Sequence, residues 1–252
     1  DNQPSGICIG VNSKDKTMQV IDSPLHTIVS ATSGSGKTTS VVLPYMMSSA
    51  KKGNSMVIHD CKQELYMMMR GMLEEEGYKV VVINFREPLC GDRFNILEYP
   101  AWLYQNGYGD KAKEMLAATV KIIAKRLHSE KDAFWELTAS DYMLMLILLA
   151  CETMPSNEVT FENVYKLHVQ GNVKMGTSSY LHRYLEDKKE SLIYALGAGA
   201  INAPNETKAS IYSEFQAILS PFILSDELCD MTYNSTFDLE NFVSGREKMA
   251  VF

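Results

Sequence analysis

The chain has 252 residues, of which 46% are hydrophobic and 22% charged, so it has the composition of a globular protein and a length that suits one large domain or two modest ones. Its 24 Lys and Arg residues against 31 Asp and Glu residues leave a net charge of −7. This charge excludes a surface that grips nucleic acid over its whole extent, because non-specific binding needs cations that neutralise phosphates. The five cysteines are odd in number and form no Cys-x-x-Cys pair, which favours reduced thiols in a cytosolic setting over disulfides or a zinc site.

The first hundred residues alternate between strand and helix patterns. Residues 7–11 and 17–21 predict a β-hairpin. Three later segments have the apolar pattern of buried strands: 27–31, 55–59 and 79–85. Helices are expected between them, with proline or glycine at their limits: from Lys37 with a kink or early end at Pro44, and over about 63–75 with Gly77 as the C-cap. This order predicts a parallel sheet with right-handed crossovers, in the α/β class.

From about residue 101 the pattern becomes helical. Helices are expected at 109–128, 133–152, 160–168, 178–196 and 205–224, and no strand pattern returns until 248–252. The longest apolar run, Tyr142 to Cys151, is shorter than the ~18–20 residues that cross a bilayer and predicts a helix buried in a core. The sequence therefore predicts an all-α domain of residues 101–236, inserted into an α/β domain made of residues 1–100 and 237–252.

A glycine-rich loop joins the first of these strands to its helix. It reads Thr32-Ser33-Gly34-Ser35-Gly36-Lys37-Thr38-Thr39, after Ala31 at the place where such loops usually have their first glycine. Gly34 and Gly36 let the chain wrap closely around phosphate oxygens, and the helix N-terminus offers free N–H groups and a favourable dipole to an anion. Lys37 is expected to reach the β- and γ-phosphates, and the Thr38 hydroxyl to ligate Mg²⁺. The loop predicts a site for ATP and Mg²⁺; the alternative is a Gly/Ser-rich turn with an incidental lysine.

Asp60 follows the second of the buried strands, at the edge where ligands bind in open α/β sheets. We expect it to hold Mg²⁺ through water or to orient Lys62, so it is a candidate catalytic residue with Lys37 and a candidate metal ligand with Thr38. The structural alternative is that Asp60 caps the following helix, and the two roles are compatible. Such loops usually have an acidic partner on a later strand that ends in Asp or Asp-Glu, and we expect that strand beyond Phe252.

Residues 109–131 are locally basic. Their charged side chains are six cations, Lys111, Lys113, Lys121, Lys125, Arg126 and Lys131, against three anions, Asp110, Glu114 and Glu130. A solvated helix face is the default interpretation of such a run. The alternative is a local contact with DNA or with an acidic partner.

Taken together, these residues resemble one family, the type IV coupling proteins, which are hexameric ATPases of conjugative DNA transfer and type IV secretion. The resemblance runs over most of the chain. It is carried by His26, Ser33–Thr38, Leu43-Pro44, Asp60-x-Lys62-x-Glu64-Leu65, Gly77-Tyr78-Lys79-Val80, Asn84-Phe85, Arg93-Phe94-Asn95-Ile96-Leu97, Ala133–Glu136 and Asn205–Ile211. The family's usual acidic element reads Asp-Pro-Lys-Gly-Glu; Cys61 and Gln63 depart from it while its charges are kept.

The resemblance implies a RecA-like P-loop nucleotide-binding domain on the cytoplasmic face of the bacterial inner membrane. It also implies an all-α domain that recruits DNA–relaxase complexes or secreted effector proteins to a type IV secretion channel. The full-length protein would be a membrane-associated homo-hexameric ATPase, and we expect this soluble stretch of it to bind ATP with little or no hydrolysis. An interpretation from another class is a nucleotide-binding switch or adaptor whose helical domain docks a partner protein without motor activity.

Overall fold

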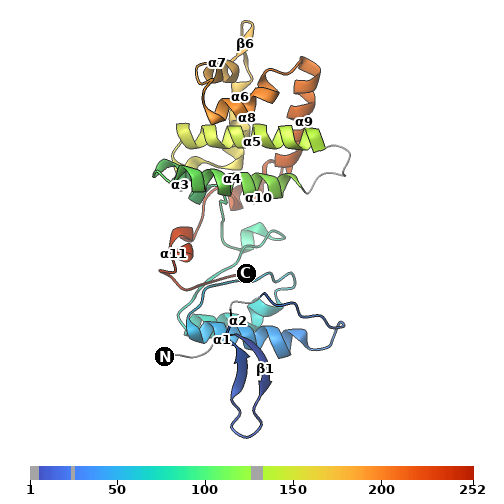
Figure 1. The fold of residues 1–252 in the computed structure, drawn as a ribbon, viewed down its shortest axis with the longest axis vertical. Helices are drawn as coiled ribbons and strands as arrows, with labels where there is room; N and C mark the ends of the chain where they lie inside the picture. The colour runs from blue at the N-terminus through green and yellow to red at the C-terminus, as the bar shows by residue number, and fades with distance from the viewer. Residues whose placement is uncertain (1–5, 24–25, 126–132) are drawn as a thin grey trace. The chain divides into compact units, whose positions relative to one another are not determined.

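The computed structural model describes residues 6–23, 26–125 and 133–252. The chain divides into two compact units. One consists of Asp1–Asn84 with Asp238–Phe252 and is called the sheet unit below; the other, Phe85–Phe237, is called the helical unit. Figure 1 shows the helices and strands of each. That residues 101–236 form one domain, and residues 1–100 with 237–252 another, stays a prediction.

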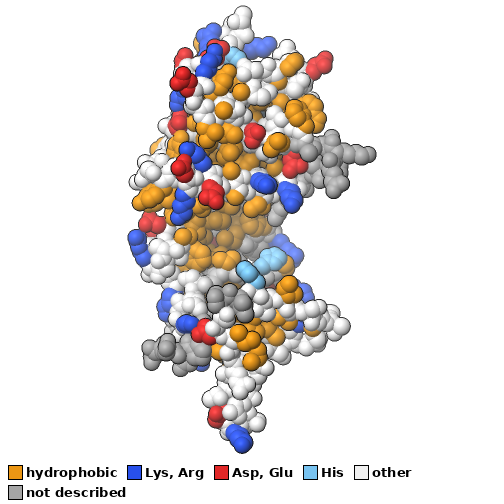
Figure 2. Space-filling model, in the orientation of Figure 1, with side chains coloured by type: hydrophobic (Ala, Val, Ile, Leu, Met, Phe, Trp, Pro, Cys, Tyr) orange, Lys and Arg blue, Asp and Glu red, His pale blue; other side chains and the backbone are white. Residues whose placement is uncertain are grey.

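The sheet unit begins with the hairpin expected from the sequence. Strands β1 (Ile7–Val11) and β2 (Met18–Ile21) pair antiparallel, with Val11 opposite Met18, so the predicted hairpin is confirmed. Lys16 takes a left-handed conformation, with φ of 58°, in the turn that joins the strands. The tip of the hairpin exposes charged side chains, which Figure 2 shows on one face of the molecule.

A three-stranded parallel sheet forms the centre of this unit. Its strands are β3 (Met56–Val57), β7 (Met249–Val251) and β4 (Lys79–Val81), and β7 lies between the other two. The regular strands are shorter than predicted, but main-chain hydrogen bonds continue the ladder from Ile58 N–H to the Val251 carbonyl and from Ile83 N–H to the Phe252 carbonyl. The predicted parallel arrangement is confirmed.

Two helices supply a small core beside the sheet. Helix α1 (Leu43–Lys52) contributes Met46 and Ala50, and α2 (Glu64–Glu75) contributes Met69 and Leu73. These side chains cluster with Ala250 of the central strand. Gly77 follows α2 with φ of 79°, which confirms the predicted glycine at the helix end. A short helix, α11 (Leu239–Val243), precedes β7 and was not predicted.

The strand predicted at 27–31 is wrong for this structure. The segment has no regular secondary structure, and the side chain of Ile28 is 94% exposed. A strand is defined by the neighbour that takes up its main-chain hydrogen bonds, and among the described residues no strand pairs with this segment. The apolar, β-branched side chains of this segment were therefore not sufficient evidence for a strand.

The helical unit is built from eight α-helices in its described residues. They are α3 (Glu98–Gln105), α4 (Gly109–Ala124), α5 (Ala133–Thr153), α6 (Phe161–Gly171), α7 (Tyr180–Glu186), α8 (Leu192–Ile201), α9 (Asn205–Ile223) and α10 (Asp226–Met231). Two single 3₁₀ turns accompany them, η2 (Pro88–Cys90) and η3 (Ser156–Glu158). The end of the helix predicted over 109–128 lies outside the described residues.

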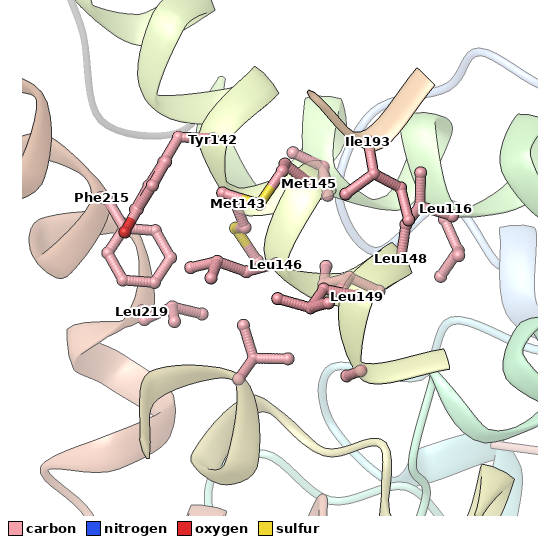
Figure 3. Packing of buried hydrophobic residues seen from close by; sticks show 14 of the residues in the cluster. Leu116, Tyr142, Met143, Met145, Leu146, Leu148, Leu149, Ile193, Phe215 and Leu219 are labelled. Atoms are coloured by element: carbon pink, nitrogen blue, oxygen red, sulfur yellow. The ribbon is translucent and has the colours of Figure 1, made fainter. Parts of the chain in front are cut away.

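Helix α5 is the centre of this unit, as predicted. It packs against α3, α4, α6, α8 and α9, and its apolar residues from Met145 to Ala150 are almost completely buried (Figure 3). The stretch Phe134–Thr153 is long and apolar enough to cross a membrane by length and composition, but more than half of it is buried inside the protein. The apolar character of its stretch from Met145 to Ala150 is explained by burial against the neighbouring helices.

Close packing of α5 and α8 depends on one glycine. A Cβ atom on Gly197 would lie 3.1 Å from Cγ of Met145. This distance is tighter than ordinary side-chain contacts, so the small residue lets the two helices approach. The buried residues of α8, Ile193, Gly197, Ala200 and Ile201, form its packing surface toward the helical core.

Two predictions for the helical unit are corrected. The single helix expected over 178–196 is two, because the chain turns after α7 and Ser191 caps α8 by accepting a hydrogen bond from Tyr194 N–H. A short antiparallel hairpin, β5 (Lys174–Met175) and β6 (Ser178–Ser179), lies where no strand was expected. Gly176, with φ of 68°, makes its turn. Helices α3 and α10 were also missed.

The beginning and the end of the helical unit are joined by a set of contacts, which we call the clasp (Asp92–Leu97 with Asp230–Phe237). Arg93 forms an ion pair of 2.8 Å with Asp230, and the rings of Phe94 and Phe237 stack. The buried Asn95 donates through Nδ2 to the Val159 carbonyl at 3.0 Å, and its Oδ1 accepts from Leu97 N–H. These contacts explain the sequence Arg93–Leu97 as a structural element of the helical unit.

Candidate nucleotide-binding site

The loop Thr32–Thr39 takes a conformation that its glycines make possible. Gly34 has φ of 76° and Gly36 has φ of 82°, in the left-handed region that side chains with a Cβ disfavour. A Cβ at Gly34 would meet no atom within 4 Å, so the requirement at this position is conformational and not one of space. Residues 32–35 are exposed, which leaves this stretch of the loop accessible to a ligand.

Lys37 is held by the main chain of the loop. Its Nζ donates hydrogen bonds to the carbonyls of Ala31 and Thr32, each at 2.7 Å. An ammonium group has three N–H donors, so this arrangement fixes the cation and leaves one donor. The half-buried side chain thus reaches back over the loop that precedes it, and its predicted contact with phosphates stays a prediction.

A helical segment follows the loop, as predicted, but its first turn is wide. Residues Thr38–Val42 form a π-helical turn, in which Leu43 N–H donates to the Thr38 carbonyl, and α1 continues from there. Pro44 lies in the first turn of α1, so the helix does not end at this proline. Thr39 Oγ1 donates to the Gly36 carbonyl at 3.1 Å and ties the loop to the first turn.

The chemistry of the loop favours an anion. The N-terminus of a helix carries free N–H groups and a partial positive charge, and the Lys37 ammonium adds a full one. The predicted cofactor residues Thr32, Ser33, Gly34, Ser35, Gly36, Lys37, Thr38 and Thr39 therefore lie together in one continuous loop and helix start. That they bind ATP stays a prediction.

Asp60 makes the contact expected of a helix cap. Its Oδ2 accepts a hydrogen bond of 2.9 Å from Tyr66 N–H in the first turn of α2, and its carbonyl accepts one from Gln63 N–H. Lys62 pairs at 3.9 Å with Glu64. Among the described residues no hydrogen bond or ion pair joins Asp60 to the loop, so its predicted metal role, shared with Thr38, stays a prediction.

Gln63 shows a feature that the sequence interpretation missed. It has φ of 60° and ψ of 13°, the left-handed conformation, directly before α2. Glycine adopts this conformation without steric cost, and glycine is the residue at this position in the family's usual Asp-Pro-Lys-Gly-Glu element. The turn is therefore kept in this chain by a residue that is strained in it. The departure from the family pattern was the signal that could have revealed it.

Three further observations bear on other predicted sites. Among the described residues no group of three or more His, Cys, Asp or Glu side chains converges as a metal site. All five cysteines are free. In the basic stretch, Lys113 pairs with Asp110 at 3.2 Å while Lys121 and Lys125 are exposed; Arg126 and Lys131 lie outside the described residues. A DNA contact at this stretch stays a prediction.

The comparison with known proteins agrees with the motifs. A family model described as Type IV secretory system Conjugative DNA transfer matches residues 7–252, which is almost the whole chain. Among curated proteins no match to the chain was found.

Proposed function

The chain belongs to the Type IV secretory system Conjugative DNA transfer family, and we propose that it is the ATP-binding part of a coupling ATPase that brings DNA–relaxase complexes or effector proteins to a secretion channel. The observation that carries the proposal is the anchored Lys37 in a loop with two left-handed glycines. Family membership places this loop in a protein of DNA transfer. The RecA-like character of the sheet unit is part of the proposal.

Four residues of the loop and Asp60 have distinct parts in this function. Gly34 and Gly36 keep the loop in the shape that surrounds the phosphates, and Lys37 neutralises their charge from its fixed position. Thr38 and Asp60 would hold Mg²⁺, directly or through water. When bound, ATP with Mg²⁺ would supply the phosphoanhydride bond whose hydrolysis drives transport, and this chain's contribution is positioning and charge neutralisation.

The other parts of the proposal concern the whole protein. The helical unit would receive the cargo, and copies of the full-length protein would form a hexamer at the cytoplasmic face of the inner membrane. In such rings an arginine from the neighbouring subunit completes the site and is worth ~10³–10⁵ in rate. We therefore propose that ATP binding is a property of this chain by itself, whereas rapid hydrolysis needs the assembled ring.

Calorimetric titration of ATP and Mg²⁺ tests the proposal. The Lys37→Ala variant is expected to lose measurable ATP affinity while its circular dichroism spectrum is unchanged, because Lys37 contacts only main-chain carbonyls of its own loop among the described residues. Lys51→Ala is the matched control, since Lys51 is an exposed lysine in the last turn of α1. This variant is expected to bind ATP with the affinity of the natural chain. Equal ATP affinity in the folded Lys37→Ala variant and the natural chain would overturn the site.

A further inference from the structure

Helix α2 of the sheet unit carries four methionines, and they differ widely in exposure. They are Met67, Met68, Met69 and Met72. The side chain of Met67 is 75% exposed and that of Met68 is 56% exposed, whereas Met69 is 4% exposed. Among the described residues no other methionine is as exposed as the first two; the next is Met18, at 42%. Two thioethers on this helix therefore face solvent directly beside one that is shielded from it.

The neighbours of these two side chains on the helix leave them uncovered. A helical side chain points toward the N-terminus and covers the preceding turn, so residues 70–72 are the ones that could cover positions 67 and 68. Arg70 is engaged elsewhere, because its guanidinium donates to Glu74 and to Tyr66 Oη, each at 2.8 Å. Met72 packs against the buried cluster of the sheet unit. Both side chains are thus directed away from this role.

Gly71 is the remaining neighbour, and it has no side chain. A Cβ atom built on it would meet no atom within 4 Å, so close packing within the chain does not require a glycine here. Its backbone is helical, so a left-handed φ does not require one either. A glycine inside a helix is less favourable than an alanine. The structural effect of this glycine is open space beside Met67 and Met68.

We propose that Met67 and Met68 form a modification site: they are the thioethers that two-electron oxidants such as hydrogen peroxide convert first to methionine sulfoxide. The sulfur lone pair attacks one peroxide oxygen, and an S–O bond forms as the O–O bond breaks. The sulfur is oxidised and the peroxide is reduced; the second oxygen takes the proton of the transferred one and leaves as water. Sulfoxide reductases reverse this change, so the modification is a reversible one.

Burial separates tolerated oxidation from damaging oxidation on the same helix. A sulfoxide is polar, so at Met67 or Met68 it remains in contact with water. At Met69 the same group would enter the buried cluster that contains Met46 and Leu73, where a polar oxygen is unfavourable. The outer pair is therefore oxidised while the fold is intact, and the inner methionines are oxidised only when the sheet unit opens.

Timed exposure of the folded chain to hydrogen peroxide, followed by tandem mass spectrometry, tests the proposal. Trypsin releases residues 63–70 as one peptide, in which fragment ions place the added oxygen on position 67, 68 or 69. We expect Met67 and Met68 to be oxidised about tenfold faster than Met69, because susceptibility follows exposure. In concentrated urea the three rates should become equal. Methionine sulfoxide reductase should remove the oxygen, which distinguishes it from oxidation of cysteine.

A variant at the glycine tests the cause of the exposure. Gly71→Leu places a side chain over the preceding turn and is expected to slow the oxidation of Met67 and Met68 about threefold. Gly109→Leu is the matched control, since a Cβ on this glycine in the first turn of α4 would likewise meet no atom within 4 Å. It is expected to leave both rates unchanged. Oxidation confined to Met67 and Met68 should leave the melting temperature unchanged.

Three results would overturn the inference. One is oxidation of Met69 at the rate of Met67 in the folded chain. Another is equal oxidation of the outer pair in Gly71→Leu and Gly109→Leu. The third is a lower melting temperature in a sample that carries sulfoxide at Met67 and Met68 alone. Each of these results leaves the proposed function in place, because none of these residues belongs to the loop Thr32–Thr39.

Discussion

The helical unit and the sheet unit use their residues in different ways. In the helical unit, α5 packs against five other helices, and side chains distant in sequence, such as Leu116, Leu146 and Phe215, belong to one buried cluster. In the sheet unit the buried cluster is small, and apolar side chains such as Ile28 and Val57 are 94% and 74% exposed. The candidate site lies in the unit with the smaller core.

The two units obtain their structures from contacts of different range along the sequence. The loop is shaped by contacts over a few residues, as in the hydrogen bonds that Lys37 donates to the Ala31 and Thr32 carbonyls. The start of α2 is likewise local, since Tyr66 N–H donates to Asp60. The helical unit is shaped by contacts between distant segments, such as the clasp. Binding loops commonly belong to the less stable parts of proteins, supported by a firmer scaffold. Four changes test whether the two units differ in this way.

The largest effect is expected in the helical core. Phe215 is fully buried and contacts the rings of Tyr142 and His168. Phe215→Ala should lower the free energy of unfolding of the helical unit by about 3–5 kcal/mol, since it leaves a cavity. Chemical denaturation followed by circular dichroism measures this loss. Calorimetry under native conditions should show unchanged ATP affinity, and a parallel loss of ATP binding would contradict the separation of the two units.

Acid is expected to have the next largest effect. His168 is buried, bonds Tyr142 Oη through Nδ1 at 3.0 Å, and burial lowers its pKa to about 4 from the usual 6.5. The unfolded chain therefore binds this proton more readily, so the stabilisation is complete above about pH 6.5 and is lost as the pH falls toward 4. The loss for the helical unit should reach up to about 3 kcal/mol.

Melting curves at pH 7 and pH 4.5 measure this dependence. His168→Gln should flatten it, because glutamine does not titrate, whereas the part-exposed His182→Gln should leave it unchanged. Burial raises the pKa of Asp141, which acts with the opposite sign and is present in every variant. An acid dependence that persists in full in His168→Gln would show that other groups cause it.

A smaller effect is expected at the clasp. Asn95→Ala removes the donor to Val159 and the acceptor for Leu97 N–H, and leaves both main-chain groups buried without these partners. The helical unit should lose about 2 kcal/mol of unfolding free energy. Denaturation curves measure it, with Asn106→Ala, an exposed asparagine that bonds the Trp102 carbonyl, as the control. Equal losses in both variants would argue against a special role for Asn95.

The smallest effect is a gain at the turn before α2. Gln63→Gly relieves the left-handed conformation of a residue with a Cβ and should stabilise the sheet unit by about 1 kcal/mol. Gln63→Ala keeps the Cβ and should give no gain, so it isolates the conformational cause. Urea midpoints of the sheet unit compare the two. A destabilised Gln63→Gly variant would mean that contacts of the glutamine side chain outweigh the strain.

The sequence by itself determined the features that depend on neighbouring residues. The glycine-lysine loop, the helix that follows it, the end of α2 at Gly77, the first hairpin and the buried nature of α5 are local in origin, because dihedral preferences and apolar periodicity act over a few residues. The positions of Lys37 and Asp60 beside their helices could be predicted for the same reason. The motifs around these residues were enough to indicate the family.

Only the tertiary structure decided the features that need a distant partner. The segments 27–31 and 248–252 both have a strand pattern in the sequence, but only the second forms a strand (β7). Strands β3 and β4 pair with β7 on either side, whereas no strand pairs with 27–31 among the described residues. The clasp around Asn95 and the close approach of α5 and α8 at Gly197 arise from packing between segments far apart in sequence. No local pattern encodes such contacts, since their energy exists only once the chain has brought the partners together.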